Sequence, residues 1–507
     1  MACLLGLDIG TTSTIGIVLD ADGKTLAKAT RPSELLSKRP NWAEEDPALW
    51  WRNSCEIVTE LLSVAGIGAG DLAAVGVTGM VPTVILLDGD GRVLRHSIQQ
   101  NDARAIREIE EMKRAIAPDT FFAKTGGSIN QQLIAPKLRW IERHEPEIFA
   151  RAKRVFGSYD YITYRLTGTA SVEHNWALES GLLDIETGDF DAELVRLGGI
   201  APDLLPPVRR SHEVVGAVTR GAAKETGLRA DTPVVAGCAD HIASAFVAGA
   251  VNDGDLVIKF GGAGDIMLSA GKPVTDPRLF IDYHIIPGLY FSNGCMAASG
   301  SVLNWILRHL GAAEARAAEA KGISAHAHMD RLAAGVPPGA DGLVLLPYFL
   351  GEKTPLHDPN ARGTLIGLGL HHGLPHIWRA ALEAVAFGFR HHIEVFEEIG
   401  LEVTRVFACD GGAASDLWLQ ITADVLARPI QRPLNHPGSS LGAAFVAGMG
   451  VDVLDDWGAI ARFVSSDRVF EPDPRRRALY DAGYGIYRET YQRLETLYPR
   501  LAALSPE

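Results

Sequence analysis

The chain has 507 residues, 47% of them hydrophobic and 22% charged, which is typical of a folded protein with two or more domains. Its formal net charge of −14 excludes the basic surface that nucleic acids or anionic membranes require. The five cysteines are not spaced in pairs, and no apolar run is long enough to span a membrane or resembles a signal peptide. We therefore expect a cytoplasmic protein with reduced thiols, and neither nucleic acid nor membrane as a partner.

The first predicted element is an apolar strand that carries one carboxylate and breaks into a small turn rich in hydroxyl groups. Asp8 lies in the strand, and Gly10, Thr11 and Thr12 follow it. A buried carboxylate needs a compensating partner, and a metal ion is a natural one. Because amides in a tight glycine turn suit phosphate oxygens, the segment indicates binding of a nucleotide triphosphate. The alternative is an ordinary hairpin turn in which Asp8 bonds to nearby backbone.

Two hairpins and two helices are predicted next. Turn sequences Ala-Asp-Gly-Lys and Gly-Asp-Gly join the strands of each hairpin, and the helices show an apolar period of 3.6 residues. The strands are predicted at 15–20, 25–30, 84–88 and 92–94, and the helices at about 101–117 and 133–149.

A third strand, at 234–237, leads to Asp240 and to a helix of small residues at about 241–249. Open α/β sheets place functional residues at the carboxyl ends of their strands, so Asp240 is a candidate general base for a substrate hydroxyl. The local sequence by itself favours a helix N-cap at Asp240, because Asp is a preferred capping residue. The adjacent His241 is more often a structural histidine than a catalytic one.

The segment 255–268 repeats the pattern of the N-terminus, with a strand, a glycine-rich turn and another strand. It lies almost midway along the chain. Two such units, one opening each half, predict two similarly built domains that face one another across a cleft. Strands mixed with long helices indicate an α/β architecture.

A third glycine-bearing turn follows in the second half. A helix at about 377–399 ends at Gly400, and a buried strand at 403–409 precedes a paired glycine and a helix at 416–427. The order strand, glycine, helix is the one with which α/β sheets bind a nucleotide against a helix start.

Motifs in a specific order extend over nearly the whole chain. They lie at 6–12, 42–47 with 50–51, 101–104, 237–240, 346–348 with 351–355, 362–363, 379–383, 410–412 and 441–444. With these motifs the chain resembles the FGGY family of carbohydrate kinases, in the actin/hexokinase/Hsp70-like superfamily. The resemblance implies two ribonuclease-H-like domains flanking a central cleft. Residues 1–250 would hold the sugar, the first phosphate turn and the base, and 251–507 the second phosphate turn and the adenosine site.

The resemblance also implies ATP-dependent phosphorylation of a sugar or polyol, with Asp8 holding Mg²⁺ and Asp240 acting as the base rather than as a cap. The positions that it assigns to ATP are Asp8, Gly10, Thr11, Thr12, Gly261, Gly262, Ala263, Gly300, Asn304, Gly411, Gly412 and Ser415. The positions that it assigns to the sugar are Val81, Pro82, Gln100, Asp102, Arg104, Asp240 and His241.

Departures from the family pattern concern the acceptor. The chain is most similar to xylulose kinase-like members, but Val81 and Pro82 replace their Met-His pair, Gln100 replaces a Trp, and His241 replaces an Asn. The resemblance implies D-xylulose as substrate, D-xylulose 5-phosphate as product, and a homodimer. The alternatives are another pentulose, a pentitol, a tetritol or glycerol as acceptor. An alternative of another class is a nucleotide-dependent switch without sugar turnover, which fold analogy does not exclude.

Overall fold

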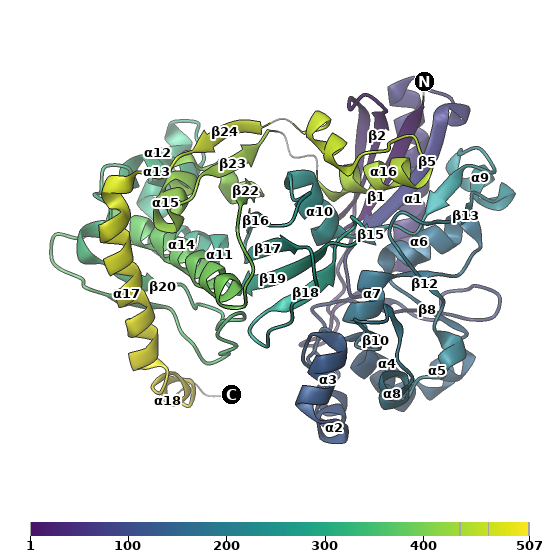
Figure 1. The fold of residues 1–507 in the computed structure, drawn as a ribbon, viewed down its shortest axis with the longest axis horizontal. Coiled ribbons are helices and arrows are strands. Elements are labelled where there is room, and N and C mark those ends of the chain that lie inside the picture. The colour runs from purple at the N-terminus through teal and green to yellow at the C-terminus, as the bar shows by residue number, and fades with distance from the viewer. Residues whose placement is uncertain (1, 435–437, 465, 505–507) are drawn as a thin grey trace. The chain divides into compact units, whose positions relative to one another are not determined.

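The computed structural model describes residues 2–434, 438–464 and 466–504 (Figure 1). Its described residues form two compact units. Unit 1 comprises those within 1–247, 282–289 and 437–464, and unit 2 those within 248–281, 290–436 and 465–507. A division into 1–250 and 251–507 therefore does not account for two later segments, which pack in unit 1.

Unit 1 is built on a 7-stranded mixed sheet, in which β1 pairs antiparallel with β2 and parallel with β5. The path across the sheet is β13-β14-β5-β1-β2-β3, and β15 also pairs with β5. The strands are β1 (Cys3–Ile9), β2 (Ser13–Asp20), β3 (Thr25–Pro32), β5 (Leu72–Gly79), β13 (Val214–Ala217), β14 (Pro233–Val235) and β15 (Cys238–Ala239).

Helix α16 (Ser439–Gly450) lies directly on this sheet because β1 and β5 carry glycine where it crosses them. A Cβ atom at Gly6 would stand 2.0 Å from the Ser440 carbonyl oxygen, and one at Gly76 would stand 2.0 Å from that of Ala443. Any side chain at either position would push the helix away. This close contact is the reason that the segment around α16 belongs to unit 1, far from its place in the sequence.

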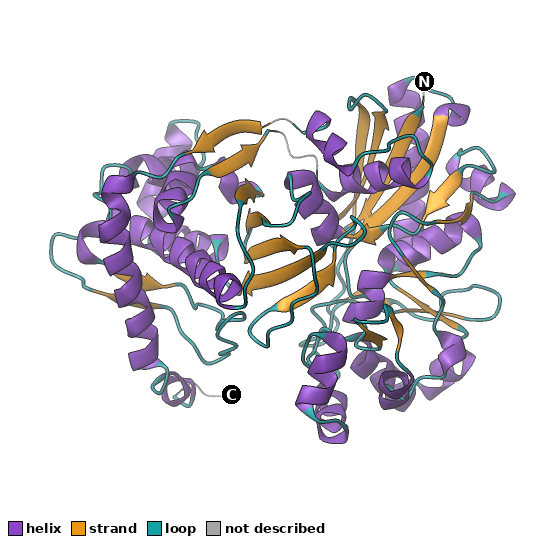
Figure 2. Ribbon diagram, in the orientation of Figure 1, coloured by secondary structure: helices purple, strands orange, loops and turns teal. Residues whose placement is uncertain are grey.

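The opposite face of the sheet is covered by α1 (Pro47–Ala65) and α6 (Ser158–Thr167). Successive strand residues point to alternate faces, so the strands have side chains that pack against these helices as well as against α16. Figure 2 shows these helices beside the strands. The remaining helices of unit 1 are α2 (Ile106–Ala115), α3 (Pro118–Thr125), α4 (Ile134–His144), α5 (Pro146–Arg151), α7 (His174–Glu179), α8 (Ala192–Leu197) and α9 (Arg220–Thr226). Helix α10 (Asp240–Ala248) ends at the boundary between the units.

Unit 2 repeats the strand arrangement of unit 1. Its central strand β16 pairs antiparallel with β17 and parallel with β22, as β1 does with β2 and β5. This repetition confirms the predicted similarity between the two halves of the chain. The order is β18 (Phe280–Tyr283), β19 (Tyr290–Met296), β17 (Gly264–Ala270), β16 (Asp255–Phe260), β22 (Arg405–Cys409), β23 (Ile430–Pro433) and β24 (Ser466–Phe470).

The core of unit 2 packs around the long helix α14 (Leu374–Glu398), which ends before Gly400 in the left-handed region, as predicted. Apolar residues of the sheet and of the neighbouring helices surround it. These helices are α11 (Gly300–His309), α12 (Ala312–Ala320), α13 (Ala325–Ala333), α15 (Asp416–Leu426), α17 (Arg477–Leu494) and α18 (Tyr498–Ala502).

The predicted hairpin at 84–94 is present in part, and one predicted helix was wrong in detail. An antiparallel bridge joins Leu87 to Val93, and the amides of Leu94 and Asp88 donate to the carbonyl oxygens of Leu86 and Arg92, at 2.9 and 3.0 Å. The strand β6 (Ile85–Leu87) also pairs with β8 (Arg154–Phe156), and residues 92–94 form no extended strand. The helix predicted at 133–149 is two helices, α4 and α5, because Pro146 cannot continue the first one.

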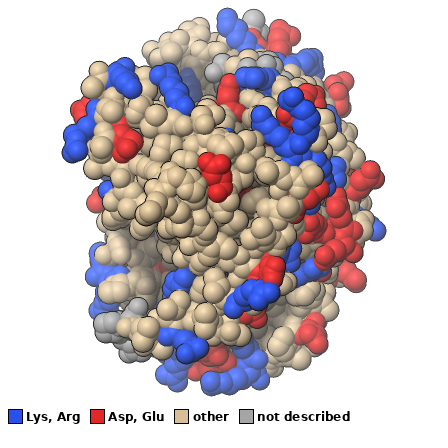
Figure 3. All heavy atoms as spheres, turned by 90° about the vertical axis from the view of Figure 1, so that its left-hand side faces the viewer, with Lys and Arg blue, Asp and Glu red and all other residues tan. Residues whose placement is uncertain are grey.

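On the face drawn in Figure 3, Lys and Arg side chains are interspersed with Asp and Glu. Within the described residues, no helix has the length and apolar character needed to cross a bilayer.

Candidate functional site

Two predicted carboxylates arise at one edge of the sheet in unit 1. Strand β5 lies between β1 and β15 and runs parallel to both. Its residue Thr78 is in register with Asp8 on β1 and with Cys238 on β15. The Thr78 hydroxyl donates a hydrogen bond of 2.7 Å to the Cys238 carbonyl oxygen, and Asp240 follows two residues later. Neighbouring strands are about 4.8 Å apart. Asp8 and the residues leading to Asp240 are therefore two strand positions from each other, at the carboxyl ends where α/β sheets bind ligands.

The electrostatics of Cys238 support this proximity. Burial raises the pKa of its thiol, and the negative charges of Glu173, Asp8 and Asp240 raise it further. Both predicted carboxylates thus act on the same buried group.

Asp8 lies beside the predicted phosphate turn and is partly exposed. Its Oδ2 accepts a hydrogen bond of 2.6 Å from the hydroxyl of Ser439, at the start of α16. The Gly10 amide donates to the Ser13 carbonyl at 3.0 Å, which closes the turn and leaves Thr12 exposed. A carboxylate next to a turn of small residues is a donor set that suits Mg²⁺, a cation that prefers oxygen ligands.

Asp240 is the first residue of α10, and 37% of its side chain is exposed. Its Oδ1 accepts a hydrogen bond of 2.6 Å from the amide of the next residue, His241. Among the described residues it makes no bond to the amides of Ile242 or Ala243, which a capping side chain would bind. Asp240 thus makes neither capping bond in this structure, and its carboxylate is accessible.

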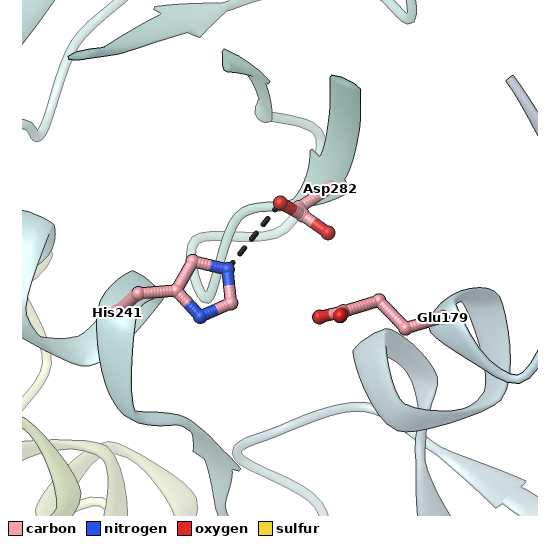
Figure 4. A group of neighbouring side chains, drawn as sticks. All are labelled: Glu179, His241 and Asp282. Atoms are coloured by element: carbon pink, nitrogen blue, oxygen red, sulfur yellow. Dashed lines mark hydrogen bonds and ion pairs between the residues drawn. The ribbon is translucent and has the colours of Figure 1, made fainter. Parts of the chain in front are cut away.

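Glu179, His241 and Asp282 form a cluster (Figure 4), and its member His241 is in contact with Asp240. His241 Nε2 lies 3.3 Å from Asp282 Oδ2, and its Nδ1 lies 3.5 Å from Asp240 Oδ1. The Glu179 carboxylate points toward the other two side chains, and one ligand atom of each of the three lies within 4.8 Å of the others. The imidazole is thus held between two carboxylates.

The charges in this cluster shift the pKa values of His241 and Glu179. Burial alone would lower the pKa of His241, but its hydrogen bonds with Asp240 and Asp282 raise the pKa well above the usual value, so the imidazole is a cation at neutral pH. Burial, together with the negative charge of Asp282, raises the pKa of Glu179 to about 8. Strongly shifted pairs of this kind are common at functional sites.

The predicted sugar-loop residues occupy varied positions. Val81 and Pro82 are buried, and Gln100 is partly exposed. Asp102 and Arg104 are ion-paired to each other at 2.6 Å and bury their charged groups within the protein. Arg104 is further held by Glu44 at 2.8 Å and by the Trp42 ring, whose centroid lies 3.7 Å from its guanidinium carbon. In this structure Asp102 and Arg104 therefore stabilise the loop around them through buried contacts.

Unit 2 contains a cavity of about 520 Å³ that brings together most of the predicted nucleotide positions. Turns after β16 and β22 meet the start of α11 there. Its lining includes the predicted residues Gly261, Gly262, Gly300, Asn304, Gly411, Gly412 and Ser415. Ala263 is not among the lining residues.

Close backbone contacts shape this cavity. The amides of Ser299 and Gly300 donate to the carbonyls of Gly262 and Gly261, at 2.8 and 2.9 Å, so the turn is bound to the start of α11. A Cβ at Gly412 would lie 2.6 Å from the Trp418 ring. The Ser415 hydroxyl caps α15 by accepting the Trp418 amide at 3.1 Å.

Several residues of these two regions were not predicted, among them four with polar side chains. Glu179 and Asp282 belong to the cluster beside Asp240, and His326 and Asp330 line the cavity. His326 Nε2 lies 3.0 Å from the predicted residue Asn304. A carboxylate in the otherwise apolar strand at 280–283 is the one signal that marked Asp282, whereas the other three carry no local pattern.

Comparison with known proteins places this geometry in context. The models of the FGGY family of carbohydrate kinases, N-terminal domain and C-terminal domain, match residues 3–247 and 262–451. The crystal structure of xylulose kinase from Rhodospirillum rubrum is 48% identical, covers 98% of this chain and 99% of its own, and superimposes with a TM-score of 0.92.

Two relatives from Bacillus subtilis (strain 168) have different acceptors in their names. A xylulose kinase is 29% identical over 500 residues, which are 98% of each chain. A gluconokinase is 27% identical over 506 residues, which are 98% of this chain and 97% of its own. The chain is thus about equally identical in sequence to a kinase named for xylulose and to one named for gluconate.

Proposed function

We propose that this chain, which belongs to the FGGY family of carbohydrate kinases, transfers the γ-phosphoryl group of ATP to D-xylulose. The product of this reaction is D-xylulose 5-phosphate. The observation that carries the proposal is the common sheet edge of Asp8 and Asp240. The full-length similarity to proteins named xylulose kinase supports the choice of sugar.

In the proposed reaction, a sugar hydroxyl oxygen attacks the γ-phosphorus, and the bond to the bridging oxygen of ADP breaks. The Asp240 carboxylate accepts the proton of that hydroxyl as the new P–O bond forms. Asp8 would hold Mg²⁺, which when bound supplies positive charge to the phosphate oxygens. The amides of the turn at Gly10 to Thr12 are suited to the same oxygens.

The cavity of unit 2 is the proposed site of the nucleoside. It is lined by glycine backbone, by aromatic rings such as Trp418 and by polar groups such as Asn304, the mixture usual in small-ligand sites. Gly261 and Gly262 would present the second phosphate turn. No threonine or serine hydroxyl is available at 262 or 263, so backbone amides would contribute the contacts there.

Another neutral acceptor is the second candidate, because the residues expected around the sugar differ from the xylulose kinase pattern at Val81, Pro82, Gln100 and His241. A pentulose other than xylulose, a pentitol, a tetritol or glycerol would use the same base. A nucleotide switch without turnover would not need an accessible carboxylate at Asp240.

The test is a screen of the purified protein with ATP and Mg²⁺ against pentuloses, pentitols, tetritols and glycerol, with ADP release as the readout. We expect D-xylulose to give the highest kcat/KM. A higher value for another neutral acceptor would correct the sugar. ADP release that no acceptor increases would contradict the kinase and favour the switch.

A further inference from the structure

The cluster of Glu179, His241 and Asp282 has no role in the proposed chemistry, although it adjoins the base. Its members come from three separate elements, α7, α10 and β18, and converge on one point (Figure 4). The side chain of His241 is 27% exposed, and that of Asp282 is 8% exposed. The cluster is therefore mostly buried but can be reached from the side of Asp240, which is itself 37% exposed.

The charges that face one another in this cluster are mainly negative. Asp240 and Asp282 flank the His241 cation, and Glu179 faces both Asp282 and His241. Glu173, which is also buried, acts on Glu179 from the start of α7. A single imidazolium thus balances only one of the two aspartates, and ionisation of Glu179 adds a further negative charge.

The hydrogen-bonding capacity of the cluster is only partly used. The buried Oε1 of Glu179 has no hydrogen-bond partner among the described residues. A carboxyl oxygen in this position suits a donor from a ligand, because burying it without a bond is unfavourable. Carboxyl oxygens accept bonds from hydroxyl groups, and the imidazolium donates to a hydroxyl or carbonyl oxygen.

We propose that Glu179 and Asp282 are specificity-determining residues of the acceptor site, which with His241 bind the hydroxyl groups of a neutral polyhydroxylated acceptor and exclude one that carries a carboxylate. The inference rests on the proposed function and deepens it by naming the acceptor class. An aldonate would bring its charge next to Asp282 and Asp240, and like charges placed together in a binding site strongly disfavour binding. A neutral sugar meets no such repulsion.

A divalent cation is a less suitable ligand for the same three side chains. Metal binding would have to displace the proton that the hydrogen bonds with Asp240 and Asp282 favour on His241. The cluster is therefore better suited to hydroxyl groups.

The experiment compares kcat/KM for the best neutral acceptor of the screen with kcat/KM for D-gluconate, at pH 7. The proteins are the wild type, Asp282→Asn, Glu179→Gln and a control, Asp191→Asn. Asp191 caps α8 and pairs with Lys124 at 2.7 Å, so the control removes a paired carboxylate outside the cluster. Circular dichroism and thermal unfolding establish that each variant is folded.

We expect the wild type to prefer the neutral acceptor by about a hundredfold or more, and Asp282→Asn to reduce this ratio by about tenfold. The change should lie mainly in KM, and the control should keep the wild-type ratio. A folded Asp282→Asn variant with an unchanged ratio, or a wild type that uses both acceptors equally, would overturn the proposal. Absence of turnover with every acceptor would instead overturn the proposed function.

A pH series tests Glu179 separately. Since the pKa of Glu179 is about 8, the group gains its negative charge as the pH rises from 7 to 9, while D-gluconate is anionic throughout. Discrimination against D-gluconate should therefore increase severalfold over this range in the wild type and stay constant in Glu179→Gln. An equal increase in both proteins would exclude Glu179 from the acceptor site.

Discussion

The sheet edge of unit 1 and the cavity of unit 2 are built on the same strand arrangement but contain opposite chemistry. In each unit a central strand ends in a glycine turn and pairs with one antiparallel and one parallel neighbour. The next-to-last residue of that strand is Asp8 in unit 1 and Lys259 in unit 2. The residues after the turn glycine are Thr11 and Thr12 in one case, and Gly262 and Ala263 in the other.

The comparison shows that the repeated backbone places a turn at the end of the central strand in both units. The side chains in and beside that turn decide which chemical groups are available there. Carboxylates gather around the edge in unit 1, where the proposed reaction needs a group that accepts a proton. The cavity in unit 2 is lined largely by glycine, alanine and aromatic residues, which fit an uncharged base or ribose. Three predictions test whether the two regions are as separate in function as in chemistry.

The largest expected effect is that of Asp240→Asn. Asparagine keeps the acceptor for the His241 amide but cannot take a proton, so kcat should fall by roughly 10²–10⁴-fold. Nucleotide affinity, measured by isothermal titration calorimetry, should stay within about twofold because the cavity of unit 2 is unaltered. Turnover like that of the wild type would reduce Asp240 to a structural residue.

An intermediate effect is expected for Gly412→Ala. The added Cβ would lie 2.6 Å from the Trp418 ring and 2.8 Å from the Phe260 carbonyl oxygen, so both lining residues must move. Overpacking of this kind costs about 1–3 kcal/mol, and nucleotide affinity should weaken by about tenfold.

Gly411→Ala is the matched control, since a Cβ there meets nothing within 4 Å. Thermal unfolding should therefore show a loss of stability for Gly412→Ala and none for Gly411→Ala, while the KM for the acceptor stays constant in Gly412→Ala. Equal stability in the two variants would show that close packing at Gly412 does not shape the cavity.

The smallest effect concerns the pH dependence of stability that the buried carboxyl group of Glu352 in unit 2 produces. Burial raises the pKa of Glu352 to about 8 from 4.5, although it accepts hydrogen bonds from the amides of Ala297 and Lys353. Folding therefore takes up a proton between these pH values, and the stability of the wild type should fall as the pH rises through that window.

Glu352→Gln keeps the acceptor oxygen and removes the titration. Its midpoint of thermal unfolding should match that of the wild type near pH 4.5 and exceed it by several degrees near pH 8. A constant difference across this range would mean that Glu352 is ionised in the folded protein at every pH tested.

Much of the secondary structure was predictable because it depends on local patterns. The hairpin of β2 and β3, the repeat at β16 and β17, and the end of α14 at Gly400 all follow from periodicity and turn residues. The bridge between Leu87 and Val93 follows from the same turn residues, but the pairing of β6 with β8, far along the chain, was not predicted. No local pattern specifies a partner at that distance.

Candidate residues that stand next to strand ends and glycine turns could be found from the sequence for the same reason. Asp8 is the next-to-last residue of a strand, Asp240 follows one, and Gly261 and Gly412 lie directly after strands. Glu179 and Asp282 could not be found in this way, because the cluster exists only after α7, α10 and β18 have been brought together. Arg104 was predicted to face the sugar, but its fit between Trp42 and two carboxylates depends on packing.

The amino-acid order by itself determined which residue types stand at the ends of the strands, because strand, turn and helix are properties of a few neighbouring residues. Tertiary structure alone decided which of these ends share an edge, that α16 closes onto Gly6 and Gly76, and that His241 lies between Asp240 and Asp282. These arrangements depend on contacts between residues distant in the sequence, whose free energy is realised only when the whole unit packs.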